Sequence, residues 1–163
     1  MKYKEQLRRL LIGITFMLFL VVDFSYGHPR SLDGSCTAEV EDLNFGSYNP
    51  FETEIKRIPF GIVVRCDEHT RFTIKIIGGN SGNPVKRYLY SPSKDSKLYY
   101  NIYYNNCPVG DGTGGSCVIN GMTTRSHHGL RAVTFTLLGV IPPHQNVPAA
   151  YDYQDTLEVI IEY

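Results

Sequence analysis

Four cysteines have the clearest chemistry in this sequence: Cys36, Cys66, Cys107 and Cys117. Such a set can form two disulfides in an oxidising compartment, or its thiolates can bind zinc. No C-x-x-C spacing occurs, so the pattern favours disulfides and predicts no metal site. Three pairings are possible. We favour Cys107–Cys117, which would close a short glycine-rich loop, together with Cys36–Cys66.

The adjacent histidines His127 and His128 are the other candidates for metal binding. On a strand they would point to opposite faces, whereas in a loop they could bind a metal with His69 or His144 as third ligand. No ligand-spacing motif accompanies them. We therefore interpret the pair as solvated loop histidines and predict neither a metal nor another cofactor.

The segment D-G-T-G-G at 111–115 resembles two catalytic motifs only in part. An aspartic protease needs D-T-G or D-S-G on two lobes, and a phosphate-binding loop continues into Gly-Lys-Ser/Thr before a helix. The nucleophile motif G-x-S-x-G does not occur either. We predict no catalytic residues and no enzyme, and interpret the segment as a tight loop closed by a disulfide.

The N-terminus has the parts of a secretory signal peptide, which would place the cysteines in an oxidising compartment. Basic residues precede the apolar run Leu10 to Val22, and Ser25-Tyr26-Gly27 offers small residues for cleavage. The apolar run is too short to span a bilayer. We predict a signal peptide over 1–27, a short segment over 28–35, and one domain over 36–163.

Charge excludes some classes of partner. Removal of residues 1–27 would leave 12 basic and 14 acidic residues, a formal charge of −2. No basic patch indicates nucleic-acid binding, and no like-charge run suggests a tail.

The last stretch, 155–163, is the clearest strand. Its sequence D-T-L-E-V-I-I-E-Y alternates, and one face carries the apolar residues Leu157, Val159, Ile161 and Tyr163. A strand at a chain terminus is easily an edge strand, and an open edge can pair with another chain. We therefore expect these four residues to mark an edge that needs a partner.

Similar alternation predicts further strands near 36–40, 55–66, 71–76, 87–90, 98–104 and 133–137. In 98–104, L-Y-Y-N-I-Y-Y, we expect tyrosine rings to be half-buried with their hydroxyls in water, although such a face can also bind sugar or protein. No segment after the signal peptide has a sustained helical period. The pattern predicts an all-β antiparallel sandwich.

Several short motifs occur in a distinctive order: L-N-F-G-S-Y at 43–48, I-V-V-R-C at 62–66, F-T-I-K-I with a glycine pair at 72–79, L-Y-Y-N-I-Y at 98–103 after Arg87, G-D-G-T at 110–113, L-G-V-I-P at 138–142 and Y-Q-D-T-L at 153–157. From Cys36 to Tyr163 the chain resembles the spore coat protein U domain family, which includes myxobacterial spore coat protein U and subunits of archaic chaperone–usher pili.

The chain departs from the family pattern in four places. Pro108-Val109 stands where a tryptophan is common, Asp152 replaces a glycine, and Cys107 and Cys117 are additional. The segment 28–35, H-P-R-S-L-D-G-S, is short and polar where polymerising pilins carry an alternating donor segment.

The resemblance implies an immunoglobulin-like sandwich that lacks its last strand, with Cys66 paired to Cys36. A periplasmic chaperone, and later another subunit, would fill the groove beside the terminal strand by strand addition. An outer-membrane usher would be a further partner, and the protein would pass through the periplasm to a surface fimbria or coat.

The function implied is an exported structural subunit of a pilus or coat, with a role in adhesion or biofilm. The short segment 28–35 suggests a cap or tip that accepts a strand without donating one. The alternative is a self-contained secreted adhesin that binds carbohydrate or protein through its tyrosines and the Cys107–Cys117 loop.

Overall fold

The computed structural model describes residues 35–66, 69–126, 129–130 and 132–163. These residues belong to one compact unit, Asp33–Tyr163. The predicted signal peptide and the histidine pair His127 and His128 lie outside the described residues.

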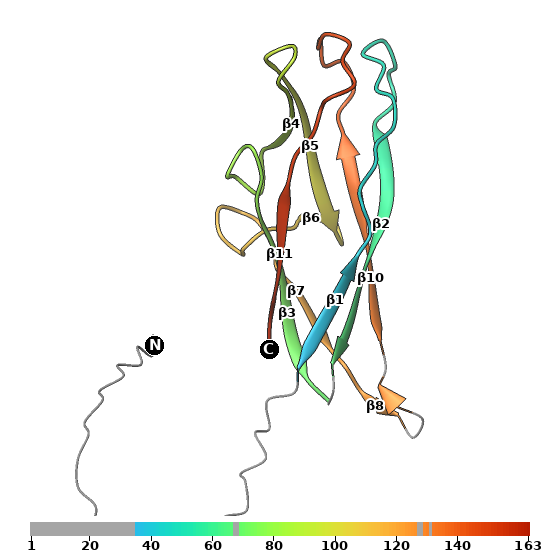
Figure 1. Cartoon of the computed structure of the whole chain (residues 1–163), viewed down its shortest axis with the longest axis vertical. Helices are drawn as coiled ribbons and strands as arrows, with labels where there is room; N and C mark the ends of the chain where they lie inside the picture. Colours follow the sequence, from blue (N-terminus) through green and yellow to red (C-terminus); the bar gives the residue numbers. More distant parts are fainter. Residues whose placement is uncertain (1–34, 67–68, 127–128, 131) are drawn as a thin grey trace, which may run out of the picture. The chain divides into compact units, whose positions relative to one another are not determined.

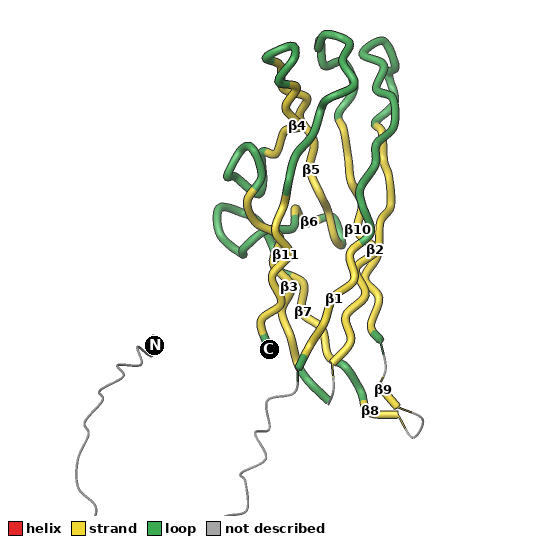
Figure 2. Tube along the Cα trace, in the orientation of Figure 1, coloured by secondary structure: helices red, strands yellow, loops and turns green. Residues whose placement is uncertain are grey.

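Across the described residues the chain forms strands and no helix (Figure 2). The strands are β1 (Cys36–Val40), β2 (Lys56–Cys66), β3 (Arg71–Gly78), β4 (Arg87–Ser91), β5 (Ser96–Tyr104), β6 (Cys107–Pro108), β7 (Ile119–Met122), β8 (Arg125–Ser126), β9 (Gly129–Leu130), β10 (Val133–Ile141) and β11 (Leu157–Glu162). The all-β prediction is confirmed. Among the same residues no helix is long and apolar enough to cross a membrane.

Two antiparallel sheets contain most of these strands (Figure 1). The larger has the order β1-β2-β10-β5-β4, with β6 also paired to β5, and the smaller has the order β11-β3-β7. Strands β8 and β9 form a separate hairpin. Strands β1 and β11 therefore lie at the edges of different sheets.

Aromatic and branched residues from both sheets meet in one hydrophobic core. The rings of Phe72 on β3 and Phe135 on β10 meet edge to face, 5.9 Å between centroids. Gly121 on β7 lies against both rings, and a Cβ there would be 2.7 Å from Phe135 Cζ. The close approach of β7 therefore depends on a residue without a side chain.

Disulfides join Cys36 to Cys66 and Cys107 to Cys117, the pairing that the sequence favoured. Cys36 and Cys66 are direct partners in the β1–β2 register. The first disulfide therefore fastens the edge strand β1 to β2, and the second closes the loop between β6 and β7.

The predicted strands are all present; the one over 36–40 has the predicted bounds, and the others have shifted ends. The segment predicted over 133–137 continues to Ile141, and that over 71–76 to Gly78. The sequence did not predict β6, β7 or the β8–β9 hairpin. In β7, Gly121 and the polar Asn120 interrupt the apolar alternation on which such a prediction depends.

Candidate functional site

Strand β11 is the edge of the smaller sheet. It pairs with β3 from Leu157↔Gly78 to Glu162↔Thr73. In the described part of the chain no strand pairs with its other edge. Strand β1 is likewise at the edge of the larger sheet and pairs only with β2 there.

The two faces of β11 differ as the alternation predicts. Leu157, Val159 and Ile161 are partly buried and pack against the core. Glu158 and Glu162 are exposed. Tyr163 was expected on the core face, but it lies beyond the last paired residue and is 61% exposed.

The open edge of β11 has a definite set of backbone groups. Just before β11, the N–H of Gln154 donates to Tyr90 O (3.0 Å), and its carbonyl accepts from Tyr90 N (2.9 Å). Strand residues direct their backbone groups to alternate sides. On β11 itself, a Cβ on Gly78 of β3 would lie 3.9 Å from Glu158 N and 4.0 Å from Thr156 O, so these groups face β3. We infer that the amides and carbonyls of the alternate residues Leu157, Val159 and Ile161 point away from β3, toward the open edge.

The C-terminal segment changes sheets just before β11. Gln154 pairs with β4 of the larger sheet, whereas β11 pairs with β3 of the smaller one. Asp155 lies at the change, and its carboxylate accepts from Asn80 N (2.6 Å), Thr156 N (2.9 Å) and the Tyr100 hydroxyl (2.8 Å). These bonds fix the point at which the terminal strand leaves the larger sheet.

Arg87 is fully buried beside this point. Its Nη1 donates to Pro84 O (2.7 Å) and Asn101 Oδ1 (2.8 Å), and its Nη2 donates to Ile76 O (2.9 Å). The guanidinium therefore ties together the end of β3, the loop that leaves it and β5. Asn101 on β5 is itself buried, and its Oδ1 accepts one of these bonds.

Burial dominates the electrostatics of this network. Burial lowers the pKa of Arg87, and the nearby Tyr100 and Asp155 partly oppose that change. Burial and the hydrogen bond to Asp155 raise the pKa of Tyr100 far above its ordinary value. The Tyr100 hydroxyl therefore stays protonated, and a donor to Asp155, well into the alkaline range.

A cleft of about 750 Å³ adjoins the same point. Two segments far apart in the sequence, 43–51 and 147–155, provide most of its walls. Phe51 and Tyr151 lie on its rim with 89% and 98% of their surfaces exposed. Asp155 is the lining residue that also belongs to the network described above.

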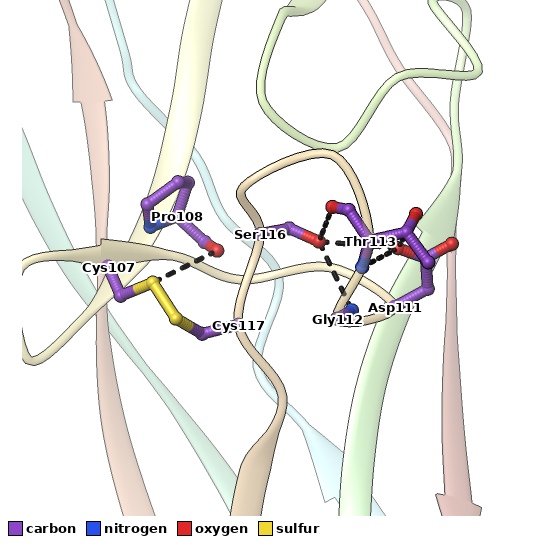
Figure 3. The surroundings of a disulfide bond; sticks show 7 residues. All are labelled: Cys107, Pro108, Asp111, Gly112, Thr113, Ser116 and Cys117. Carbon is purple, nitrogen blue, oxygen red and sulfur yellow. Dashed lines mark hydrogen bonds between the residues drawn. A yellow bond between two sulfur atoms is a disulfide. The ribbon is translucent and has the colours of Figure 1, made fainter.

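The disulfide-closed loop is held by its own side chains (Figure 3). The Asp111 carboxylate accepts from Thr113 N (2.9 Å), the Thr113 hydroxyl (2.8 Å) and the Ser116 hydroxyl (3.2 Å). The bonds from Thr113, ahead of the one from Ser116, lower the pKa of Asp111. The D-G-T-G-G segment is thus a self-contained turn.

The described residues contain no group of three or more histidine, cysteine, aspartate or glutamate side chains that could hold a metal. All four cysteines are in disulfides.

Comparisons with known proteins point to one family. A family model described as the Spore Coat Protein U domain matches residues 29–160. A search of curated protein sequences finds no match. Solved structures that match include a chain of the CsuC–CsuE chaperone–tip adhesion subunit pre-assembly complex, from archaic chaperone–usher Csu pili of Acinetobacter baumannii. The two chains share 18% identity at a TM-score of 0.56, and the match covers 80% of this chain and 40% of that one.

Proposed function

Because the chain belongs to the Spore Coat Protein U domain family, we propose that it is an exported structural subunit of a surface pilus or coat, assembled by strand complementation. This is a structural role rather than an enzymatic one. The fold shared with a chain from an archaic chaperone–usher complex supports the proposal.

The open edge of β11 carries the proposal. An apolar face formed by Leu157, Val159 and Ile161 is only partly buried, although these residues pack on the core. An added strand would bond to the outward backbone groups of β11 and complete the burial of this face. Its own alternate side chains would set the register, because a slip by one residue exposes every apolar group.

The proposed partners follow from this mode of assembly. A periplasmic chaperone would occupy the edge during export, an outer-membrane usher would receive the complex, and another subunit would then replace the chaperone. The final location would be the cell surface. The short, polar segment 28–35 supports a cap or tip position, in which the subunit accepts a strand and donates none.

Export is the first test. We expect the chain to accumulate in the periplasm only when its chaperone is co-expressed, because the half-covered face otherwise exposes the chain to aggregation and proteolysis. The measurement is the amount of soluble, disulfide-bonded chain with and without the chaperone. A stable monomer that accumulates equally well without it would disprove the proposal.

A pair of substitutions tests the edge itself. Val159→Pro removes an N–H that we place on the open edge, and proline is tolerated on strand edges. Val159→Thr keeps the N–H and the branched shape. We expect a tagged chaperone to recover the threonine variant at the wild-type level and the proline variant at a much lower level. Equal recovery would show that this edge is not where the chaperone binds.

A further inference from the structure

We propose that the cleft between segments 43–51 and 147–155 binds a neutral carbohydrate, with Phe51 and Tyr151 packing against sugar rings. None of Leu157, Val159 and Ile161 lines the cleft, although its wall 147–155 leads into β11. The inference concerns a sugar rather than an added strand, and so it goes beyond the proposed subunit function.

Two large aromatic side chains are exposed at the rim of the cleft. Phe51 and Tyr151 are 89% and 98% exposed, and they come from loops a hundred residues apart in the sequence. Both line the same cleft. Exposed apolar groups that converge on one concavity mark a binding surface, whereas single exposed ones are common.

Hydrogen bonds hold the walls of the cleft in place before any ligand binds. The Tyr48 hydroxyl donates to Pro142 O (3.2 Å) and accepts from Gln145 N (2.8 Å). On the facing segment, the Tyr153 hydroxyl donates to Pro148 O (3.0 Å). A ligand would therefore meet walls that are already formed, which reduces the entropy lost on binding.

The lining is suited to an uncharged ligand. Among the described residues that line it, Asp155 has the only charged side chain, and three donors already satisfy that carboxylate. None of the arginine, lysine and histidine residues that the structure describes lines the cleft to neutralise an anion. An acidic sugar or a phosphate would lose its hydration there without gaining a counter-charge.

Polar groups in the lining are available to hydroxyls. Within the described residues the Ser47 hydroxyl and the Gln154 side-chain amide, which both line the cleft, make no hydrogen bond. Together they offer donors and acceptors beside aromatic rings and aliphatic walls. A pyranose has matching chemistry, with an apolar face of C–H groups and a periphery of hydroxyls.

The concave shape argues against a flat apolar surface as the ligand. Such a surface would contact Phe51 and Tyr151 on the rim, but it could not enter the cleft to reach its polar groups. An oligosaccharide can do both, because individual sugar rings can enter a concave site while others contact its rim.

The test uses the full mature chain, purified in the form in which it accumulates in the periplasm. Calorimetry with three neutral hexasaccharides, cellohexaose, maltohexaose and mannohexaose, is compared with hexagalacturonic acid. We expect at least one neutral probe to bind and the acidic one not to bind. Failure of all three neutral probes up to about 10 mM would overturn the proposal.

Variants locate the site. Phe51→Ala and Tyr151→Ala should each weaken binding about tenfold, which corresponds to about 1.4 kcal/mol. Because both side chains are exposed, neither change should alter the thermal transition. Tyr163→Ala, an exposed tyrosine outside the cleft, is the matched control and should bind normally. Unchanged binding in both rim variants would overturn the proposal.

Discussion

Two tyrosines allow the buried network at the sheet change to be tested with one chemical substitution. The Tyr100 hydroxyl donates to Asp155 and the Tyr90 hydroxyl donates to Asp95, each over 2.8 Å. Tyr100 is 5% exposed, whereas the Tyr90 bond lies in the open β4–β5 turn. Replacing each tyrosine with phenylalanine removes the same bond from two different environments.

The two losses should differ widely. A hydrogen bond to a charged group contributes about 1.5–3 kcal/mol when it is protected from water. Tyr100→Phe keeps the ring, whose centroid lies 5.6 Å from that of Phe45, so no cavity forms. We therefore expect a loss of about 2 kcal/mol from the free energy of unfolding. Tyr90→Phe should change stability little, because water replaces the lost hydroxyl.

The same two substitutions should also differ in how the free energy of unfolding depends on pH in the alkaline range. In the folded chain the pKa of Tyr100 is raised above the ordinary value of 10.0, and so the unfolded chain loses this proton first. The stabilisation is complete below pH 10 and falls by about 1.4 kcal/mol per pH unit above it. Tyr100→Phe should make that slope shallower, and the remaining slope includes Tyr90, whose pKa is raised by its hydrogen bond to Asp95.

The assay is urea unfolding of the purified chain and both variants, at neutral pH and between pH 9 and about 11. Equal losses for Tyr90→Phe and Tyr100→Phe, or a loss below about 0.5 kcal/mol for Tyr100→Phe, would refute the reasoning. An alkaline slope as steep in Tyr100→Phe as in the wild-type chain would refute it as well.

Three further predictions concern packing and loop closure. Gly121→Ala should cost about 1–3 kcal/mol, measured as a lower thermal midpoint, because the new methyl group meets two core phenylalanine rings; a midpoint unchanged from wild type would contradict this. Replacing both Cys107 and Cys117 with serine should lower the free energy of unfolding in urea by about 3 kcal/mol, because the disulfide joins residues with a sequence separation of 10. The variant should still fold, and a loss near zero would contradict the prediction. Asp111→Asn should make the free energy of unfolding depend less on pH in the acid range. The pKa of Asp111 is lowered in the folded chain, so the carboxylate stabilises the fold above its unfolded pKa and loses this effect as pH falls. Identical acid unfolding curves for the variant and the wild type would contradict this.

The sequence predicted strands well where buried and exposed residues alternate along the chain. Strands such as β5 and β11 alternate between core and solvent, and their positions follow from that pattern. Strand β7 could not be found in this way. Its buried contact depends on Gly121, whose importance is the absence of a side chain, and only the position of the two phenylalanine rings reveals this.

The network around Arg87 could not be predicted either, for a different reason. The motif order singled out Arg87, but an arginine at the start of a strand is usually exposed. Its acceptors include the backbone carbonyls of Pro84 and Ile76, which carry no sequence signature. Only the sheet change brings these carbonyls, Asn101 and the charge of Asp155 near one guanidinium.

Under the proposed function, the open edge of β11 accepts a strand from another protein and must still avoid pairing with copies of itself. Antiparallel pairing of two β11 strands centred on Ile160 would place Glu158 of each chain opposite Glu162 of the other. Like charges directly opposite each other destabilise a strand pair. Within the chain, Lys75 of β3 forms an ion pair with Glu162 over 2.6 Å, and so a second copy would have to compete for that ammonium. A strand with neutral or basic residues at these positions would meet no such repulsion. The two exposed glutamates therefore disfavour self-association of the edge while leaving it open to a different segment.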